Sequence, residues 1–320
     1  MAQENVLNKA VTYEDIYDDP YDINKLFVHI IPIYGEFFRT NINAGFGVKA
    51  DYYLGKKADF SFFFRKPYSK KADFVRYDAI QNSDFENTPK TYYLLELGGA
   101  YHIIDKEKDG KSKFILYSKS LQKPDQWEST IHEHVEAPVK VRQIYAARLG
   151  GFYYQSALDI KDILKAQHAS LYDSAGDAMP SELKAFGNLS VGGIYLGGAL
   201  TQIRNVALKF DKTYDQVSSD LIFSAYLDLM YAPLVAIKDL YYRPSPGSPE
   251  VIYYTSNVKT NPLGFRIGIY GKFNRDLGWG YGIESGIRPG IKKQGVYFLG
   301  RISFPLVSSK LTSSVEAFGK

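Results

Sequence analysis

The sequence predicts an all-β protein, a transmembrane antiparallel β-barrel of about 12 strands (12–14) with long loops and one short rim helix. Three observations carry this prediction. Aromatic residues make up 15% of the 320 residues, with 27 Tyr and 20 Phe, a composition typical of strands. Apolar and polar residues alternate in segment after segment, as strands with two different faces require. The polar face is rich in Gly and Tyr with spaced Arg, Asp and Glu, whereas the water-facing side of a soluble β-sandwich would be rich in Lys, Glu, Thr and Ser.

The clearest strand spans residues 263–273. Leu263, Phe265 and Ile267 alternate there with Gly264 and Arg266, so one face is apolar and the other is polar or small. The same period recurs along the chain, and 188–210 is long enough for two strands; a hairpin in 234–256 would raise the total to about 14. The predicted strands are 26–37, 42–52, 58–64, 91–104, 113–120, 139–154, 188–210, 219–231, 263–273, 281–291 and 296–304.

A single barrel domain is expected over residues 26–306. An extended N-terminal arm, 1–25, precedes it, and a C-terminal tail, 307–320, follows it. The chain starts Met-Ala-Gln-Glu, without the charged and apolar regions of a signal peptide. A cytoplasmic protein would simply begin here, and an exported protein in its mature form would look the same; the strand pattern leads us to expect the second.

The connections differ in length, as in barrels with a short-turn side and an exposed-loop side. Residues 105–110 are predicted to form a turn between two strands. In the long gap that follows residue 157, Ile160, Ile163 and Leu164 recur at helical spacing. This spacing predicts the short rim helix over residues 159–171.

The placement of Tyr fits the thickness of a bilayer. Tyr93 and Tyr101 lie on one strand face, eight residues apart, as do Tyr145 and Tyr153. Eight tilted strand residues span roughly 20 Å of the membrane normal, close to the ~25 Å apolar band between two aromatic girdles. The alternative is that Tyr simply favours strands. The predicted girdle residues are Tyr52, Tyr93, Tyr101, Tyr145, Tyr153, Tyr231 and Tyr281.

Charged side chains on the polar faces are expected to line the lumen. They carry both signs, and opposite charges tend to pair across a narrow bore; a ring of one sign would have indicated an ion-selective pore. The alternative is a wall of solvated residues. The predicted lumen residues are Lys49, Asp51, Asp59, Glu96, Arg142, Arg148, Arg204, Asp228, Arg266, Glu284, Arg288 and Arg301.

Several other chemistries are disfavoured. The chain has no Cys, which excludes disulfides and thiolate sites, and its net charge of +4 forms no basic block for nucleic acid. His132, His134 and Glu136 share one side of an extended segment, a geometry that can hold a divalent metal, but an ordinary polar loop is the expected reading. The acidic stretch 14–22 lacks the spacing of a calcium loop.

No catalytic residue, cofactor or metal is therefore predicted. Of the 5 His residues, only His29 and His102 fall in predicted strands, and neither belongs to a recognisable hydrolase motif. We expect a protein that is not an enzyme.

The Tyr- and Phe-rich strands, the Gly-spaced polar face of 265–290 and the start Ala2-Gln3 together resemble outer-membrane barrels of the Bacteroidota. The resemblance implies an outer-membrane location with lipid contacts, and a role as a diffusion channel or as a barrel subunit of secretion or outer-membrane assembly machinery. Our leading prediction is an accessory or scaffold subunit with protein partners in the envelope. A narrow passive channel for small solutes is the alternative, and a soluble β-rich binding protein is a third.

Overall fold

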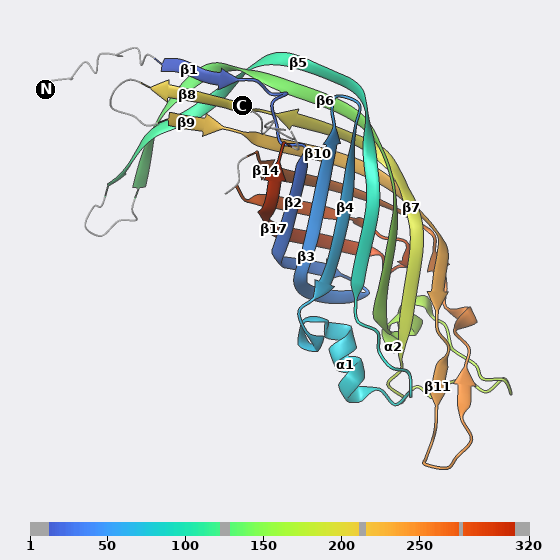
Figure 1. Cartoon of the computed structure of the whole chain (residues 1–320). Coiled ribbons are helices and arrows are strands. Elements are labelled where there is room, and N and C mark those ends of the chain that lie inside the picture. The colour runs from blue at the N-terminus through green and yellow to red at the C-terminus, as the bar shows by residue number, and fades with distance from the viewer. Residues whose placement is uncertain (1–12, 122–128, 211–215, 275–277, 311–320) are drawn as a thin grey trace, which may run out of the picture.

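The computed structural model describes residues 13–121, 129–210, 216–274 and 278–310, and for 115–121 and 129–134 it describes the backbone only. Ten antiparallel strands close into a barrel (Figure 1). Gly35 of the first barrel strand pairs with Gly300 of the last, and the remaining strands pair in sequence around the ring. The barrel strands are β2 (Leu26–Phe38), β3 (Asn41–Leu54), β4 (Ala58–Pro67), β5 (Tyr93–Leu121), β6 (Ser129–Asp159), β7 (Phe186–Ile203), β10 (Leu221–Ile237), β14 (Leu263–Phe273), β15 (Gly280–Ile287) and β17 (Val296–Ser309).

The prediction of about 12 barrel strands is wrong by two. The predicted strands 91–104 and 113–120 are one strand, β5, and the predicted turn at 105–110 is part of it, because β6 supplies a partner along this whole stretch. The segment 188–210 does contain two strands, but its second, β8 (Val206–Phe210), leaves the barrel. The predicted hairpin in 234–256 also lies outside the barrel, as β11 (Leu240–Tyr242) and β12 (Val251–Tyr253).

The outer face of the barrel is apolar and the inner face carries the charges. Ile267 and Leu229 are 57% and 67% exposed, whereas Arg266 and Asp228, which precede them on β14 and β10, are buried. Within the described residues, no helix is long and apolar enough to cross a membrane.

Strands β5 and β6 extend far beyond the barrel. They have 29 and 31 residues, against 8 to 18 in the other barrel strands. Their ends curve over a separate three-stranded sheet made of β1 (Tyr13–Asp18), β8 and β9 (Gln216–Ser219) (Figure 1). The two layers share an apolar core of Phe114, Ala137, Val139, Val141, Val206, Leu208 and Phe210. We call this part of the molecule the β1-end extension.

Residues 19–25 join the β1-end extension to the barrel. Ile23 is buried in an apolar cluster at the mouth of the barrel, together with Phe27 and Ile203. Asn24 holds the segment in place by donating two hydrogen bonds to Asn274, from its backbone N–H to Oδ1 at 2.8 Å and from its side-chain amide to the backbone oxygen at 2.9 Å. The described part of the predicted arm is therefore folded against the barrel.

Loops and short helices close the opposite end, which we call the helix end (Figure 1). The rim helix predicted over 159–171 is α2 (Ile160–Gln167); Ile160, Ile163 and Leu164 are buried, and the Asp159 side chain caps its first turn. A second helix, α1 (Phe74–Asn82), lies in a gap where none was predicted. The other short elements here are η1 (Lys70–Ala72), η2 (Thr255–Asn257), β13 (Thr260–Asn261) and β16 (Gly290–Ile291).

Candidate functional site in the barrel interior

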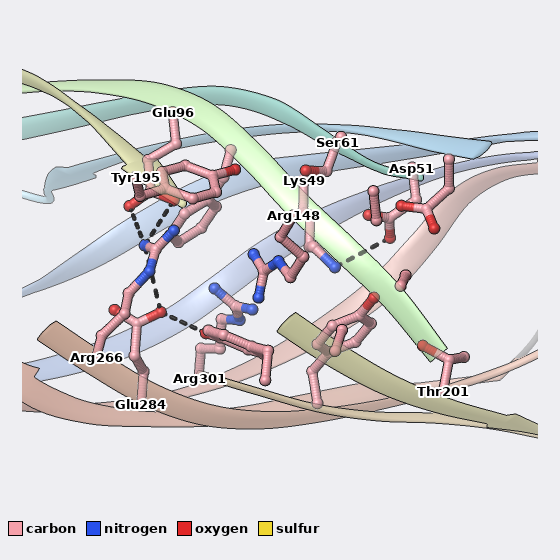
Figure 2. Close-up of a pocket in the computed structure, with 18 residues that line it drawn as sticks. Lys49, Asp51, Ser61, Glu96, Arg148, Tyr195, Thr201, Arg266, Glu284 and Arg301 are labelled. Carbon is pink, nitrogen blue, oxygen red and sulfur yellow. Dashed lines mark hydrogen bonds and ion pairs between the residues drawn. The ribbon is translucent and has the colours of Figure 1, made fainter. Parts of the chain in front are cut away.

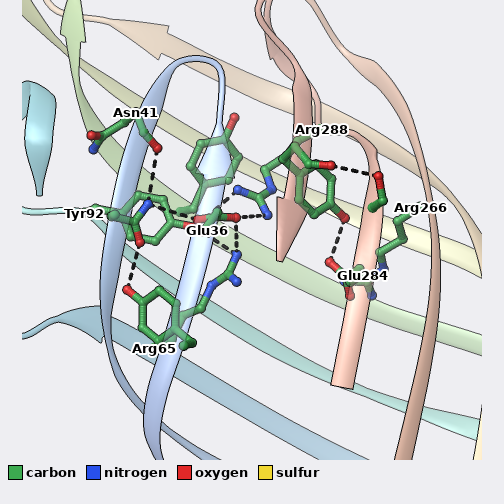
Figure 3. Close-up of polar contacts among 12 residues, drawn as sticks. Glu36, Asn41, Arg65, Tyr92, Arg266, Glu284 and Arg288 are labelled. Carbon is green, nitrogen blue, oxygen red and sulfur yellow. Dashed lines mark hydrogen bonds and ion pairs between the residues drawn. The ribbon is translucent and has the colours of Figure 1, made fainter. Parts of the chain in front are cut away.

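A buried carboxylate holds two arginines near the helix end (Figure 3). Glu36 of β2 accepts hydrogen bonds from Arg65 of β4 and from Arg288, each at 2.7 Å. Asn43 donates to the second oxygen of Glu36 at 3.1 Å, and the Tyr92 hydroxyl accepts from both guanidinium groups at 3.0 and 3.2 Å. The three charged side chains are at most 2% exposed. The Glu36 carboxylate is therefore the shared counter-charge of two guanidinium groups, in a site where water does not screen the charges.

Hydrogen bonds from Asp73 attach the loop that carries α1 to this end of the barrel. Its carboxylate accepts from Asn41 Nδ2 at 2.7 Å and from the backbone N–H of Tyr92 at 2.8 Å. Asn41 also donates to Ser156 at 3.0 Å. Burial raises the pKa of Asp73 above its usual value, although these hydrogen bonds oppose the shift.

A second ion-pair cluster crosses the middle of the bore. Arg266 of β14 donates to both oxygens of Glu96 of β5, at 2.7 and 2.8 Å, and to Asp228 of β10 at 2.8 Å. Glu284 lies 3.7 Å from the same guanidinium, and Arg148 lies 3.5 Å from Asp228. Strands β5 and β14 are separated by three other strands around the ten-stranded ring. The Arg266–Glu96 pair therefore spans the lumen rather than lining one wall.

Further ion pairs lie towards the β1 end. Asp51 of β3 accepts from Lys272 of β14 at 2.7 Å and from Lys49 at 3.0 Å, so this contact also reaches across the bore. Arg142 holds Asp105 through two hydrogen bonds of 2.8 and 2.6 Å. The apolar cluster around Ile23 lies at the same end of the barrel.

Tyrosine side chains fill the space over glycines of the inner wall. A Cβ at Gly98 or Gly150 would lie 2.1 or 2.4 Å from the Tyr195 hydroxyl, and one at Gly268 would lie 2.4 Å from Tyr226. Glycine is therefore required at these positions so that the rings can lie flat on the wall. The Gly- and Tyr-rich polar face seen in the sequence is this packing.

Two small cavities lie in the described interior. One of about 50 Å³ lies between the central cluster and Asp51 (Figure 2), and one of about 10 Å³ lies beside Lys272. The larger cavity has room for about three to five waters. Paired charges and tyrosine side chains therefore occupy the described part of the bore around these cavities.

The predicted lumen residues are mostly brought together here. Eleven of the twelve take part in the clusters above or line the central cavity. The exception is Arg204, which lies between β7 and β8 at the β1 end. Several residues that complete the clusters were not predicted, among them Glu36, Arg65, Tyr92, Asp105 and Lys272. Arg65 continues the polar face just past the predicted end of its strand, and Lys272 alternates with the apolar residues of β14. The alternation of faces along each strand could therefore have assigned both side chains to the interior.

The predicted girdle residues lie on the outer face in two groups. Strand direction places Tyr52, Tyr101, Tyr145 and Tyr281 towards the β1 end, and Tyr93, Tyr153 and Tyr231 towards the helix end. The rings of Tyr93 and Tyr153 are neighbours, with centroids 5.8 Å apart.

The side chains of His132 and His134, which were weighed as metal ligands, lie outside the described residues. Among the residues that are described, no group of three or more His, Cys, Asp or Glu is arranged to hold a metal ion.

Comparison with known proteins gives a weak structural likeness. No family model matches the chain, and no curated protein matches it. A solved structure named as the CymD monoaromatic hydrocarbon channel is similar with a TM-score of 0.21 and 8% sequence identity, over 91% of this chain and 93% of that chain. What this protein does is therefore inferred from its own residues.

Proposed function

We propose that this chain is a closed outer-membrane barrel that acts as an accessory or scaffold subunit of an envelope protein complex and is not an enzyme. The observation that carries the proposal is the filled interior. The Arg266–Glu96 and Lys272–Asp51 pairs cross the bore, and separating a buried ion pair leaves charges without partners, which costs several kcal/mol.

The outer-membrane location rests on the outer face. An apolar band with Tyr at both of its ends suits a bilayer, because lipid covers apolar side chains and the headgroup region favours aromatic side chains. A large exposed apolar surface in water would instead promote aggregation. The same location is implied by the Bacteroidota barrels that the sequence resembles.

The scaffold role rests on structure that the barrel itself does not require. Pairing of β5 with β4 ends at Tyr101, and pairing of β6 with β7 ends at Arg142. Beyond these residues the two strands pair with each other and cover β8, so the β1-end extension adds a folded sheet that lies outside the apolar band. Such a sheet offers a partner protein both a surface and two edge strands, β1 and β9.

A His–Ser contact in the described interior does not by itself favour an enzymatic role. His29 lies 3.3 Å from Ser303, but the cavity beside them has a volume of only about 10 Å³, which is too small for an organic substrate.

The second candidate is the narrow passive channel. It is favoured by the polar cavity of about 50 Å³ in the bore, because widening of this cavity along the bore would form a water-filled path. This function requires the cross-bore ion pairs to separate.

Planar bilayer recordings of the purified protein distinguish the two functions. The scaffold proposal predicts no steady conductance. Stable single-channel steps would contradict it and would support the passive channel instead. In parallel, affinity purification in mild detergent should recover a stoichiometric partner.

A shortened hairpin tests where that partner binds. Residues 110–139 would be replaced by Asn-Gly, which suits a tight hairpin turn and joins the paired residues Asp109 and Lys140. We expect this variant to lose the partner. The matched control shortens the exposed 244–249 loop at the helix end and should retain it. Partner retention by the first variant would contradict the proposed docking role of the β1-end extension.

A further inference from the structure

One arginine of the interior has no acceptor. Arg301 of β17 lines the central cavity, and within the described part of the chain it makes neither a hydrogen bond nor an ion pair. Its guanidinium lies over the ring of Phe63, 4.5 Å from the centroid. A ring face attracts a cation, but it does not satisfy the five N–H donors of arginine.

Arg148 points into the same space. Figure 2 shows its guanidinium directed towards that of Arg301 across the middle of the cavity. Asp228, its carboxylate neighbour, lies 3.5 Å away and is already engaged by Arg266, and Arg148 Nη1 has no hydrogen-bond partner. Two guanidinium groups that converge away from bulk water repel each other, because the low local dielectric screens their charges poorly.

The carboxylates that line the central cavity are engaged by other groups. The lining contains four cations, Lys49, Arg148, Arg266 and Arg301, and four carboxylates, Asp51, Asp59, Glu96 and Glu284. Glu96 binds Arg266, and Asp51 binds Lys49 and Lys272. Asp59 lies 3.0 Å from His102, and Glu284 accepts hydrogen bonds from the hydroxyls of Tyr226 and Tyr297. Within the described lining, Arg301 is therefore left without a counter-charge.

We propose that the central cavity binds a small monovalent inorganic anion, of the size of chloride, between Arg148 and Arg301. The anion accepts hydrogen bonds from both guanidinium groups and supplies the counter-charge that Arg301 lacks. Asp51, Asp59, Glu96 and Glu284 line other parts of the same cavity, so the site accepts an ion close to the two arginines and rejects a larger or multivalent anion. This site exists whether or not the barrel conducts, and its failure leaves the scaffold proposal intact.

Anomalous diffraction from bromide locates the ion directly. Crystals of the full chain would be soaked in sodium bromide, and data would be collected at the bromine absorption edge. We expect a peak between Arg148 and Arg301, and loss of that peak in Arg301→Gln. Absence of a peak in the cavity of the unmodified protein would overturn the proposal, and this readout does not depend on the folding of any variant.

Chloride-dependent stability gives a second readout in solution. The thermal midpoint in detergent would be measured while chloride replaces gluconate at constant ionic strength. The midpoint should rise with chloride and then saturate, because an ion that binds only the folded state stabilises it by mass action. Arg301→Gln should lose this rise, whereas Arg243→Gln, which removes an exposed arginine paired with Glu86, should keep it. An unchanged chloride response in Arg301→Gln would reject the site.

Discussion

Substitution of Glu36 by Gln isolates the energetic role of the buried charges. Gln keeps the shape and one acceptor oxygen but removes the negative charge, so Arg65 and Arg288 are left facing each other without a counter-charge. Both are bound to Glu36 at 2.7 Å and are at most 2% exposed. Removal of one partner from a buried ion pair costs about 3–5 kcal/mol, and we expect the free energy of unfolding to fall by that amount.

An exposed ion pair of the same length provides the control. Lys310 Nζ lies 2.7 Å from Asp22, but the two side chains are 49% and 55% exposed. Solvent screens such a pair, so Lys310→Gln should change the free energy of unfolding by no more than about 1 kcal/mol. The two variants therefore differ mainly in the burial of the charges that are disturbed.

Urea unfolding in lipid vesicles measures both variants, with the free energy obtained by linear extrapolation. The reasoning is refuted if Glu36→Gln costs no more than Lys310→Gln. That result would mean that water reaches the Glu36 cluster, and it would also weaken the case for a closed interior.

Three further outcomes are expected. Ile267→Arg places a charge on the lipid face and should reduce the free energy of unfolding in vesicles by about 2–4 kcal/mol if the residue lies near the bilayer midplane; a smaller effect than that of a water-exposed substitution would contradict the assigned facing. Gly150→Ala should cost about 1–3 kcal/mol because its Cβ would overlap Tyr195, whereas Gly198→Ala, whose nearest atom would be 3.8 Å away, should be nearly neutral in the same urea titration. Because the pKa of Asp73 is raised on folding, the stability that this shift contributes is fully present below the unfolded pKa of about 3.9 and is lost as pH rises through the folded pKa. Asp73→Asn should abolish this pH dependence of the free energy of unfolding. If the variant keeps the pH profile of the unmodified protein between the two pKa values, Asp73 is not its source.

The strands show which features local sequence patterns predict and which they do not. The alternation in 263–273 assigned the apolar side chains to one face and Arg266 to the other, and the structure places them so. The predicted turn at 105–110 contains charged residues and Gly, which locally favour a turn. In the folded chain β6 pairs with this whole stretch, and the hydrogen bonds of that ladder outweigh the local preference.

The sequence alone determined that the chain is all-β, which face of most strands is apolar, and where a rim helix lies, because these depend on residues two to four positions apart. The number of strands in the barrel and the partners of each charge were decided only by the tertiary structure. Glu96 and Arg266 are 170 residues apart, and nothing in the local pattern of either strand identifies the other. Their contact depends on how many strands separate them around the ring, since ring size sets which walls face each other across the bore and whether side chains can meet there.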